Sequence, residues 1–256
     1  MSESKSSGVV DEGRKFVPKS NSIGSSTVTL EMTNNTEDLK FAKITFVLDD
    51  IARNIVNAAI ETGYELIGTV ILTQDDTNGN KRSQCVSKIY SKSSASSSCL
   101  IHQCGDIPEY IQSSWARLLI SHPECKSCLI LSGLPIAAYN SDMSLGGLRV
   151  LFTTSAQAEA REKFASCMPL EIGNILSGCT ASVVCECEYN FLEAVVCVSL
   201  KGLSYSQEAA EMFGNISEQM KDYLAVESLS LSGKNSLHSK MIKSDQFLSR
   251  TENMYI

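Results

Sequence analysis

The chain has 256 residues, of which 43% are apolar and 20% are charged, a balance typical of globular proteins rather than of disordered ones. This length predicts one domain or two small ones. The net charge of −7 argues against a nucleic-acid-binding protein, because neutralising phosphates requires a basic surface. No run approaches the roughly 18 apolar residues of a membrane helix, and the polar start of the chain lacks a signal segment. We therefore expect a cytoplasmic or nuclear protein without nucleic-acid or membrane partners, whose ten cysteines are mostly free thiols.

The first half of the chain predicts strands around one helix, after a leader at residues 1–26 that we expect to be disordered. The helix should begin near Asp49 or Asp50, place Ile51, Ile55, Ala58 and Ala59 on one face and end at Gly63. Asn78-Gly79 favours a hairpin turn between two of the strands. Alternating or continuous apolar residues predict strands at 27–32, 44–48, 64–72, 85–90 and 99–101.

The second half alternates helices with apolar strands. Asp106-Ile107-Pro108 predicts a helix start with an acidic cap, and Ile111, Trp115, Leu118 and Leu119 continue it at helical spacing. Residues 134–170 are ambiguous, apart from a short helix expected within 156–164. The apolar positions Ile172, Ile175, Leu176, Cys179 and Val183 predict a further helix. Strands are expected at 128–131 and 194–198, and a last helix at 206–224.

This order of elements predicts an α/β fold, with helices on both faces of a mixed sheet. One domain should span residues 27–226. Beyond it, serines punctuate residues 227–256, which predicts a flexible tail.

The sequence offers no assembled catalytic set and suggests no cofactor. Cys125-x-x-Cys128 and Cys185-x-Cys187 lack a histidine partner for zinc, so buried free thiols are the favoured interpretation. His102 lies near Cys104, but adjacency in sequence is weak evidence for a Cys–His pair. Glu186 and Glu188 are expected to be solvated. Gly146-Gly147 lacks the further residues of a phosphate-binding loop.

The last three residues, Met254, Tyr255 and Ile256, are candidate partner-binding residues. Apolar and aromatic groups at the end of a flexible tail can enter a pocket on a partner, and a terminal carboxylate can be held by a lysine or by backbone N–H groups. The tail alone should bind at roughly micromolar to millimolar levels. A second contact from the folded domain would raise its effective concentration near the pocket.

This ending matches the hydrophobic–Tyr–any-residue (HbYX) motif of proteins that dock on the proteasome core particle, and the chain resembles the proteasome assembly chaperone 1 family. Outside the tail, the resemblance covers about residues 107–200. It lies in Pro108 to His122 with Ser127 to Ser132, Ser144 to Arg149, Met168 to Cys185 and Ala194 to Leu200.

The resemblance implies a three-layer α/β/α sandwich like that of nucleoside phosphorylases, without their catalytic residues. It implies a heterodimer with proteasome assembly chaperone 2, docking on proteasome α-type subunits and insertion of Met254, Tyr255 and Ile256 between neighbouring subunits. The expected function is non-enzymatic assembly of the α ring of the 20S core particle. Two alternatives remain: a catalytic nucleoside-phosphorylase-like enzyme, and an adaptor whose tail binds an unrelated partner.

Overall fold

The computed structural model describes most of the region between residues 26 and 201. The described residues are 26–32, 41–48, 53–61, 63–75, 80–92, 97–121, 124–135, 139 and 148–201. The predicted leader, the predicted helix at 206–224 and the predicted tail therefore lie outside the described residues.

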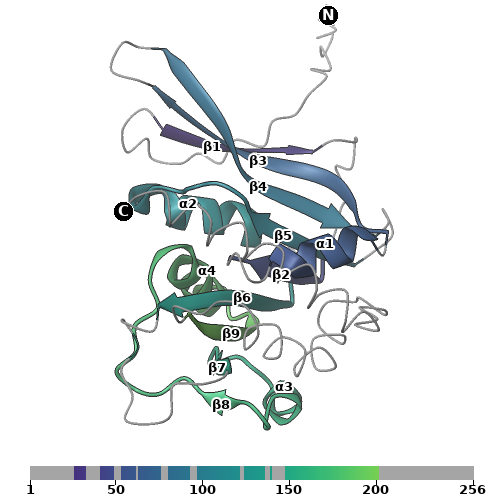
Figure 1. Ribbon diagram of the computed structural model, residues 1–256, viewed down its shortest axis with the longest axis vertical. Helices are drawn as coiled ribbons and strands as arrows, with labels where there is room; N and C mark the ends of the chain where they lie inside the picture. Colours follow the sequence, from purple (N-terminus) through teal and green to yellow (C-terminus); the bar gives the residue numbers. More distant parts are fainter. Residues whose placement is uncertain are drawn as a thin grey trace, which may run out of the picture.

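Nine strands within these ranges form one mixed sheet, in the order β1-β3-β4-β5-β2-β6-β9-β7-β8. Figure 1 shows this order from β1 at the top to β8 at the bottom. The central strands β5, β2, β6 and β9 run parallel to one another, whereas β1, β3, β4 and β5 pair antiparallel, and β7 pairs antiparallel with β9. The strands are β1 (Ser26–Met32), β2 (Lys43–Val47), β3 (Glu65–Asp75), β4 (Lys81–Ser91), β5 (Ser98–Gln103), β6 (Ser127–Pro135), β7 (Leu148–Phe152), β8 (Met168–Pro169) and β9 (Glu193–Lys201).

Four described helices cover the two faces of the sheet. They are α1 (Arg53–Glu61), α2 (Glu109–Ile120), α3 (Ala158–Lys163) and α4 (Gly178–Tyr189). Helices α2 and α4 lie side by side against one face, and α1 and α3 lie against the other (Figure 1). The molecule is thus the predicted α/β fold with helices on both faces of a mixed sheet.

Strand β6 shows how the sequence produces these layers. Its apolar residues 128–131 place side chains on both faces of the sheet. Cys128 and Ile130 lie in the core beneath α2 and α4. Leu129 and Leu131 lie in the core beneath α1 and α3. Because successive strand residues point to opposite faces, such a run is stable only where both faces are covered. All four side chains are at most 1% exposed, which agrees with the prediction of helices on both faces of the sheet.

The hairpin β3–β4 and helix α1 follow the predicted pattern. Gly63 ends α1 with a φ of 95°, a left-handed conformation that glycine adopts without strain. Asn78-Gly79 lies outside the described residues, but β3 and β4 pair antiparallel from Asp75↔Lys81 as the hairpin requires.

Two helix starts differ from the prediction. Helix α2 has Pro108 at its N-cap position, so Asp106 does not cap it. Helix α4 begins only at Gly178, and Ile172 and Ile175 precede it as exposed residues. Positive φ values at Gly173 and Gly178 break the helical path that the apolar spacing suggested.

Candidate functional site

The predicted partner-binding residues Met254, Tyr255 and Ile256 lie outside the described residues, as do Gly146-Gly147, His122 and His238. The structure therefore describes the folded body that would carry the tail. Within it, three groups of side chains combine charge, aromatic rings or thiols in a way that bears on function.

The first group is the α2–α4 surface, which consists of Tyr110, Arg117, Glu186 and Tyr189. Arg117 of α2 donates to Oε1 of Glu186 on α4 from Nε at 3.3 Å and from Nη2 at 3.1 Å. The hydrogen bonds to Glu186 raise the pKa of Arg117, and the negative charge of Glu186 raises it further by a smaller amount. Glu186 is buried, contrary to the expectation of a solvated carboxylate.

Glu188 is partly exposed, and its carboxylate is also hydrogen-bonded to a neighbouring segment. Its Oε1 accepts a bond from the backbone N–H of Thr154 at 2.8 Å, and its Oε2 accepts one from the Thr154 hydroxyl at 2.6 Å. The two glutamates therefore connect α4 to two different neighbours, α2 and the segment that follows β7. Because the two glutamates are two residues apart, their side chains point to different sides of α4 and can contact different neighbours.

Two tyrosines complete the α2–α4 surface. Tyr189 is 78% exposed and lies close enough to Arg117 to raise its pKa further. Tyr110 is 53% exposed and lies seven residues before Arg117, on the same side of α2. Its hydroxyl forms a hydrogen bond with Ser26 Oγ at 3.0 Å and accepts one from Gln74 Nε2 at 2.8 Å. Tyrosine and arginine are the residues enriched at protein interfaces, so this surface has the composition of a protein-recognition surface.

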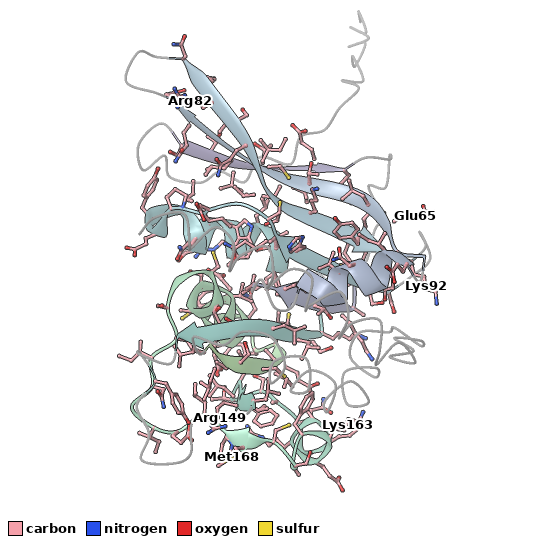
Figure 2. All side chains as sticks on the ribbon, in the orientation of Figure 1. Glu65, Arg82, Lys92, Arg149, Lys163 and Met168 are labelled. Atoms are coloured by element: carbon pink, nitrogen blue, oxygen red, sulfur yellow. The ribbon has the colours of Figure 1, made fainter. Side chains whose placement is uncertain are left out.

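The second group is the Arg149 cluster, formed by Arg149, Tyr139 and Glu171. Arg149 belongs to β7 and is fully buried. Its Nε donates to Tyr139 Oη at 2.9 Å and to Glu171 Oε1 at 3.1 Å. The guanidinium carbon also lies 5.4 Å from the centre of the Tyr139 ring. Figure 2 shows Arg149 near Met168, its register partner on β8, far from Arg82 on the β3–β4 hairpin.

Sequence reasoning did not single out this cluster. Strand β7 lies in the range that the pattern left ambiguous, and the role of Arg149 depends on residues ten and 22 positions away. The available signal was one arginine within an otherwise apolar run, Leu148 to Phe152. A buried arginine requires a partner, so that signal alone predicts an acidic or aromatic neighbour.

The third group consists of thiols. The predicted buried thiols are confirmed for Cys125, Cys128 and Cys187, whereas Cys185 is exposed because it lies on the outer side of α4. The Sγ atoms of Cys125 and Cys128 are 3.6 Å apart. Their hydrogen bond lowers the pKa of Cys125 and raises that of Cys128. Among the described residues, no group of three or more His, Cys, Asp or Glu side chains is arranged to hold a metal ion.

His102 and Cys104 are close in sequence, which alone is weak evidence for a Cys–His pair. His102 is 9% exposed and therefore lies in the core. The thiol contact of Cys104 is with Cys85, with the two Sγ atoms 3.8 Å apart.

None of the described helices is both long and apolar enough to cross a membrane.

Comparison with solved structures finds similar proteins, whereas comparison of sequences does not. No protein-family model matches the sequence, and no curated protein matches it significantly. PbaA of Pyrococcus furiosus, described as an archaeal homolog of proteasome-assembly chaperone, is 17% identical with a TM-score of 0.52 over 88% of this chain and 99% of its own. The fold is that of the proteasome-assembly chaperone homologues.

Further solved structures support this assignment of the fold. PbaB of Pyrococcus furiosus, an archaeal proteasome activator, is 10% identical, with a TM-score of 0.57 over 90% of this chain and 100% of its own. A proteasome-assembly chaperone homologue of Mycobacterium tuberculosis is 12% identical, with a TM-score of 0.50 over 79% of this chain and 94% of its own. These three similar proteins are described as chaperone homologues or as an activator, and none as an enzyme.

Proposed function

We propose that this protein is a non-enzymatic chaperone for assembly of the 20S proteasome α ring. The observation that carries the proposal is the fold shared with PbaA over 88% of this chain. The proposed partners are proteasome α-type subunits and proteasome assembly chaperone 2, with which it would form a heterodimer. Assembly would take place in the cytoplasm or the nucleus, without a cofactor.

The mode of docking that we propose uses the tail. With Ile256 as the free carboxyl terminus, Met254 would enter an apolar pocket between neighbouring α subunits. Tyr255 would place its ring on the pocket wall, and the terminal carboxylate would meet a lysine or backbone N–H groups. Burial of the Tyr255 ring supplies about 2 kcal/mol, which corresponds to about 30-fold in affinity.

A binding measurement tests the tail. The Tyr255→Ala variant is expected to bind α-ring precursors about 30-fold more weakly than the wild type in a titration at fixed salt concentration. Asn253→Ala is the matched control, because it changes the residue just before the motif and should leave binding unchanged. Equal affinity of the wild type and Tyr255→Ala would contradict insertion of the tail.

The body would supply the second contact, and the α2–α4 surface is a described surface with suitable composition. In the double variant Arg117→Ala/Tyr189→Ala, both exposed side chains are removed while Tyr110 keeps its bonds to Ser26 and Gln74. Weaker binding of this variant with an unchanged circular dichroism spectrum would support a docking role for the surface. Unchanged binding would assign the body contact to another face.

A second candidate function is activation of the mature proteasome, which the similarity to PbaB favours. The two functions differ in what the protein acts upon. A chaperone increases the yield of assembled rings from separate α subunits, whereas an activator increases peptide hydrolysis by particles that are already complete. Measuring both quantities with the same preparation distinguishes them.

A further inference from the structure

Two thiols from neighbouring strands meet at the surface of the described body. Cys85 lies in β4, and Cys104 follows directly after β5. Their Sγ atoms are 3.8 Å apart. Cys104 is exposed and Cys85 is half-buried, so dissolved reagents can reach the pair.

The backbone around the pair explains this proximity. Strands β4 and β5 pair antiparallel, and a register irregularity in β4 lies at Cys85 to Ser87. Beyond the last paired residue, the N–H groups of Cys104 and Gly105 both donate to the carbonyl oxygen of Val86, at 2.9 and 3.2 Å. The segment after β5 therefore stays against β4, which holds Cys104 beside Cys85.

Gly105 permits this close approach. A Cβ atom at this position would lie 2.9 Å from the carbonyl oxygen of Cys85 and 3.3 Å from the Cα atom of Val86, so only glycine fits against the backbone of β4. Nearby, Gln84 Nε2 donates to the carbonyl oxygen of Asp106 at 3.0 Å. The thiols are thus held together by contacts that do not depend on the sulfur atoms themselves.

The other cysteines provide an internal comparison. The Cys125–Cys128 pair is closer, at 3.6 Å, but both of its residues are buried. Cys185 is exposed, and its neighbour in the sequence motif, Cys187, is buried. Among the described cysteines, Cys85 and Cys104 therefore combine a sulfur neighbour within 4 Å with access to solvent.

We propose that Cys85 and Cys104 are a reversible redox site, which forms an intramolecular disulfide by exchange with a low-molecular-weight disulfide such as oxidised glutathione. A disulfide requires an S–S distance of about 2.05 Å, so the two sulfur atoms must approach by rotation of their side chains while the strands stay paired. Exposed disulfides of this kind are the labile ones, which small thiols can reduce again.

The exchange has two steps. The Cys85 thiolate attacks one sulfur of oxidised glutathione, forms a mixed disulfide and releases a glutathione thiolate. Cys104, after losing its proton to solvent, attacks the Cys85 sulfur, forms the internal disulfide and releases the second glutathione. Two cysteine thiols are oxidised, one glutathione disulfide is reduced to two thiols, and the reverse exchange restores the starting state.

The surroundings of the reduced pair affect the ionisation of Cys104. Partial burial and the neighbouring Cys85 thiol raise the pKa of Cys104 to about 11, although the charge of Lys88 acts in the opposite direction. Cys104 thus keeps its proton at neutral pH, and its attack on the mixed disulfide requires loss of that proton to solvent. The positive charge of Lys88 also favours approach of the anionic glutathione.

The experiment treats the reduced full-length protein with oxidised glutathione and maps its cysteines by mass spectrometry without reduction. We expect a peptide pair linked through Cys85 and Cys104, together with a glutathione adduct that persists on the exposed Cys185. Cys125 and Cys128 are expected to remain thiols. In the Cys104→Ser variant, Cys85 should instead retain glutathione.

Two further measurements complete the test. The linked form should keep the circular dichroism spectrum of the reduced protein and unfold at a temperature a few degrees higher, because the bond closes a loop in the unfolded chain. Excess reduced glutathione should break the link. Separate adducts on Cys85 and Cys104, linkage of either to another cysteine, or thiols that persist at both while Cys185 is modified would each overturn the proposal.

Discussion

Arg149 places a full positive charge inside a strand that is otherwise apolar. Its side chain is 1% exposed, and the Glu171 carboxylate that pairs with it is 24% exposed. Removing charges from water is costly, so such a pair contributes less to net stability than its geometry suggests. Loss of one partner is more damaging, because the remaining charge then lies in a poorly solvated site without compensation.

Replacement of Arg149 by Met is therefore expected to lower the free energy of unfolding by about 3–5 kcal/mol. Urea unfolding followed by circular dichroism measures this loss. Lys163→Met is the matched control, because Lys163 forms an exposed ion pair with Glu159 at 2.9 Å; its loss should cost less than about 1 kcal/mol. Similar costs for both variants would show that Arg149 has no special structural role.

Glu171 makes the same cluster sensitive to acid. Desolvation raises the pKa of its carboxyl, but hydrogen bonds from Tyr139, from its own backbone and from Arg149 outweigh that effect and leave the pKa below its ordinary value. Because the folded-state pKa lies below the unfolded-state pKa, the carboxylate adds stability above the unfolded value. That contribution is lost as the pH falls through the folded value.

The variant Glu171→Gln cannot titrate at this position. The wild type should therefore be more stable than Glu171→Gln near neutral pH, and the difference should shrink as the pH is lowered through the acidic range. Urea midpoints measured at a series of pH values provide the test. A difference that stays constant with pH would mean that the carboxyl does not titrate differently in the folded state.

At the scale of elements, a buried hydrogen bond between Trp115 and Ser87 connects α2 to the sheet. Trp115 of α2 is fully buried, and its indole Nε1 donates to Ser87 Oγ of β4 at 3.0 Å. The ring also packs edge-to-face against Phe46 of β2, with the centroids 6.1 Å apart. Because Trp115 is the one tryptophan of the sequence, its fluorescence reports on this contact.

The Ser87→Ala variant removes the acceptor and leaves the indole N–H buried. It is expected to lose about 1–3 kcal/mol of unfolding free energy, measured by urea titration with tryptophan fluorescence. Ser83→Ala is the control on the same strand, because Ser83 bonds to Thr73 at 2.9 Å in an exposed position. An equal effect of the two substitutions would show that the buried indole N–H finds another acceptor.

The elements also show which features of the fold the sequence determines locally. Strand β6 and helix α2 could be predicted because the burial of Leu129, Ile130 and Trp115 follows from their own apolar pattern. The start of α4 could not, because an apolar spacing does not show whether Gly173 and Gly178 adopt positive φ values. The pairing of β7 with β9 and the partners of Arg149 and Glu186 depend on contacts between distant segments, and no local pattern encodes them.

At the scale of the whole molecule, the proposed function requires two attachments. The predicted tail at residues 227–256 would tether the HbYX residues to a folded body. A flexible linker of about 28 residues has a root-mean-square span of about 30 Å, which allows the tail to reach a pocket beside the docked body. Once one attachment has formed, the other becomes intramolecular, and its effective concentration reaches the millimolar range.

This tethering predicts a large difference between the tail alone and the whole protein. A synthetic peptide of the last ten or so residues should bind α-ring precursors about 100- to 10,000-fold more weakly than the full chain. Competition of each against a fluorescently labelled full chain measures the ratio. A peptide ending in Met-Ala-Ile provides the control for sequence-specific binding. If peptide and full chain bound equally well, the body would contribute no contact, and the fold shared with the chaperone homologues would have to serve some other part of the function, such as pairing with the second chaperone subunit.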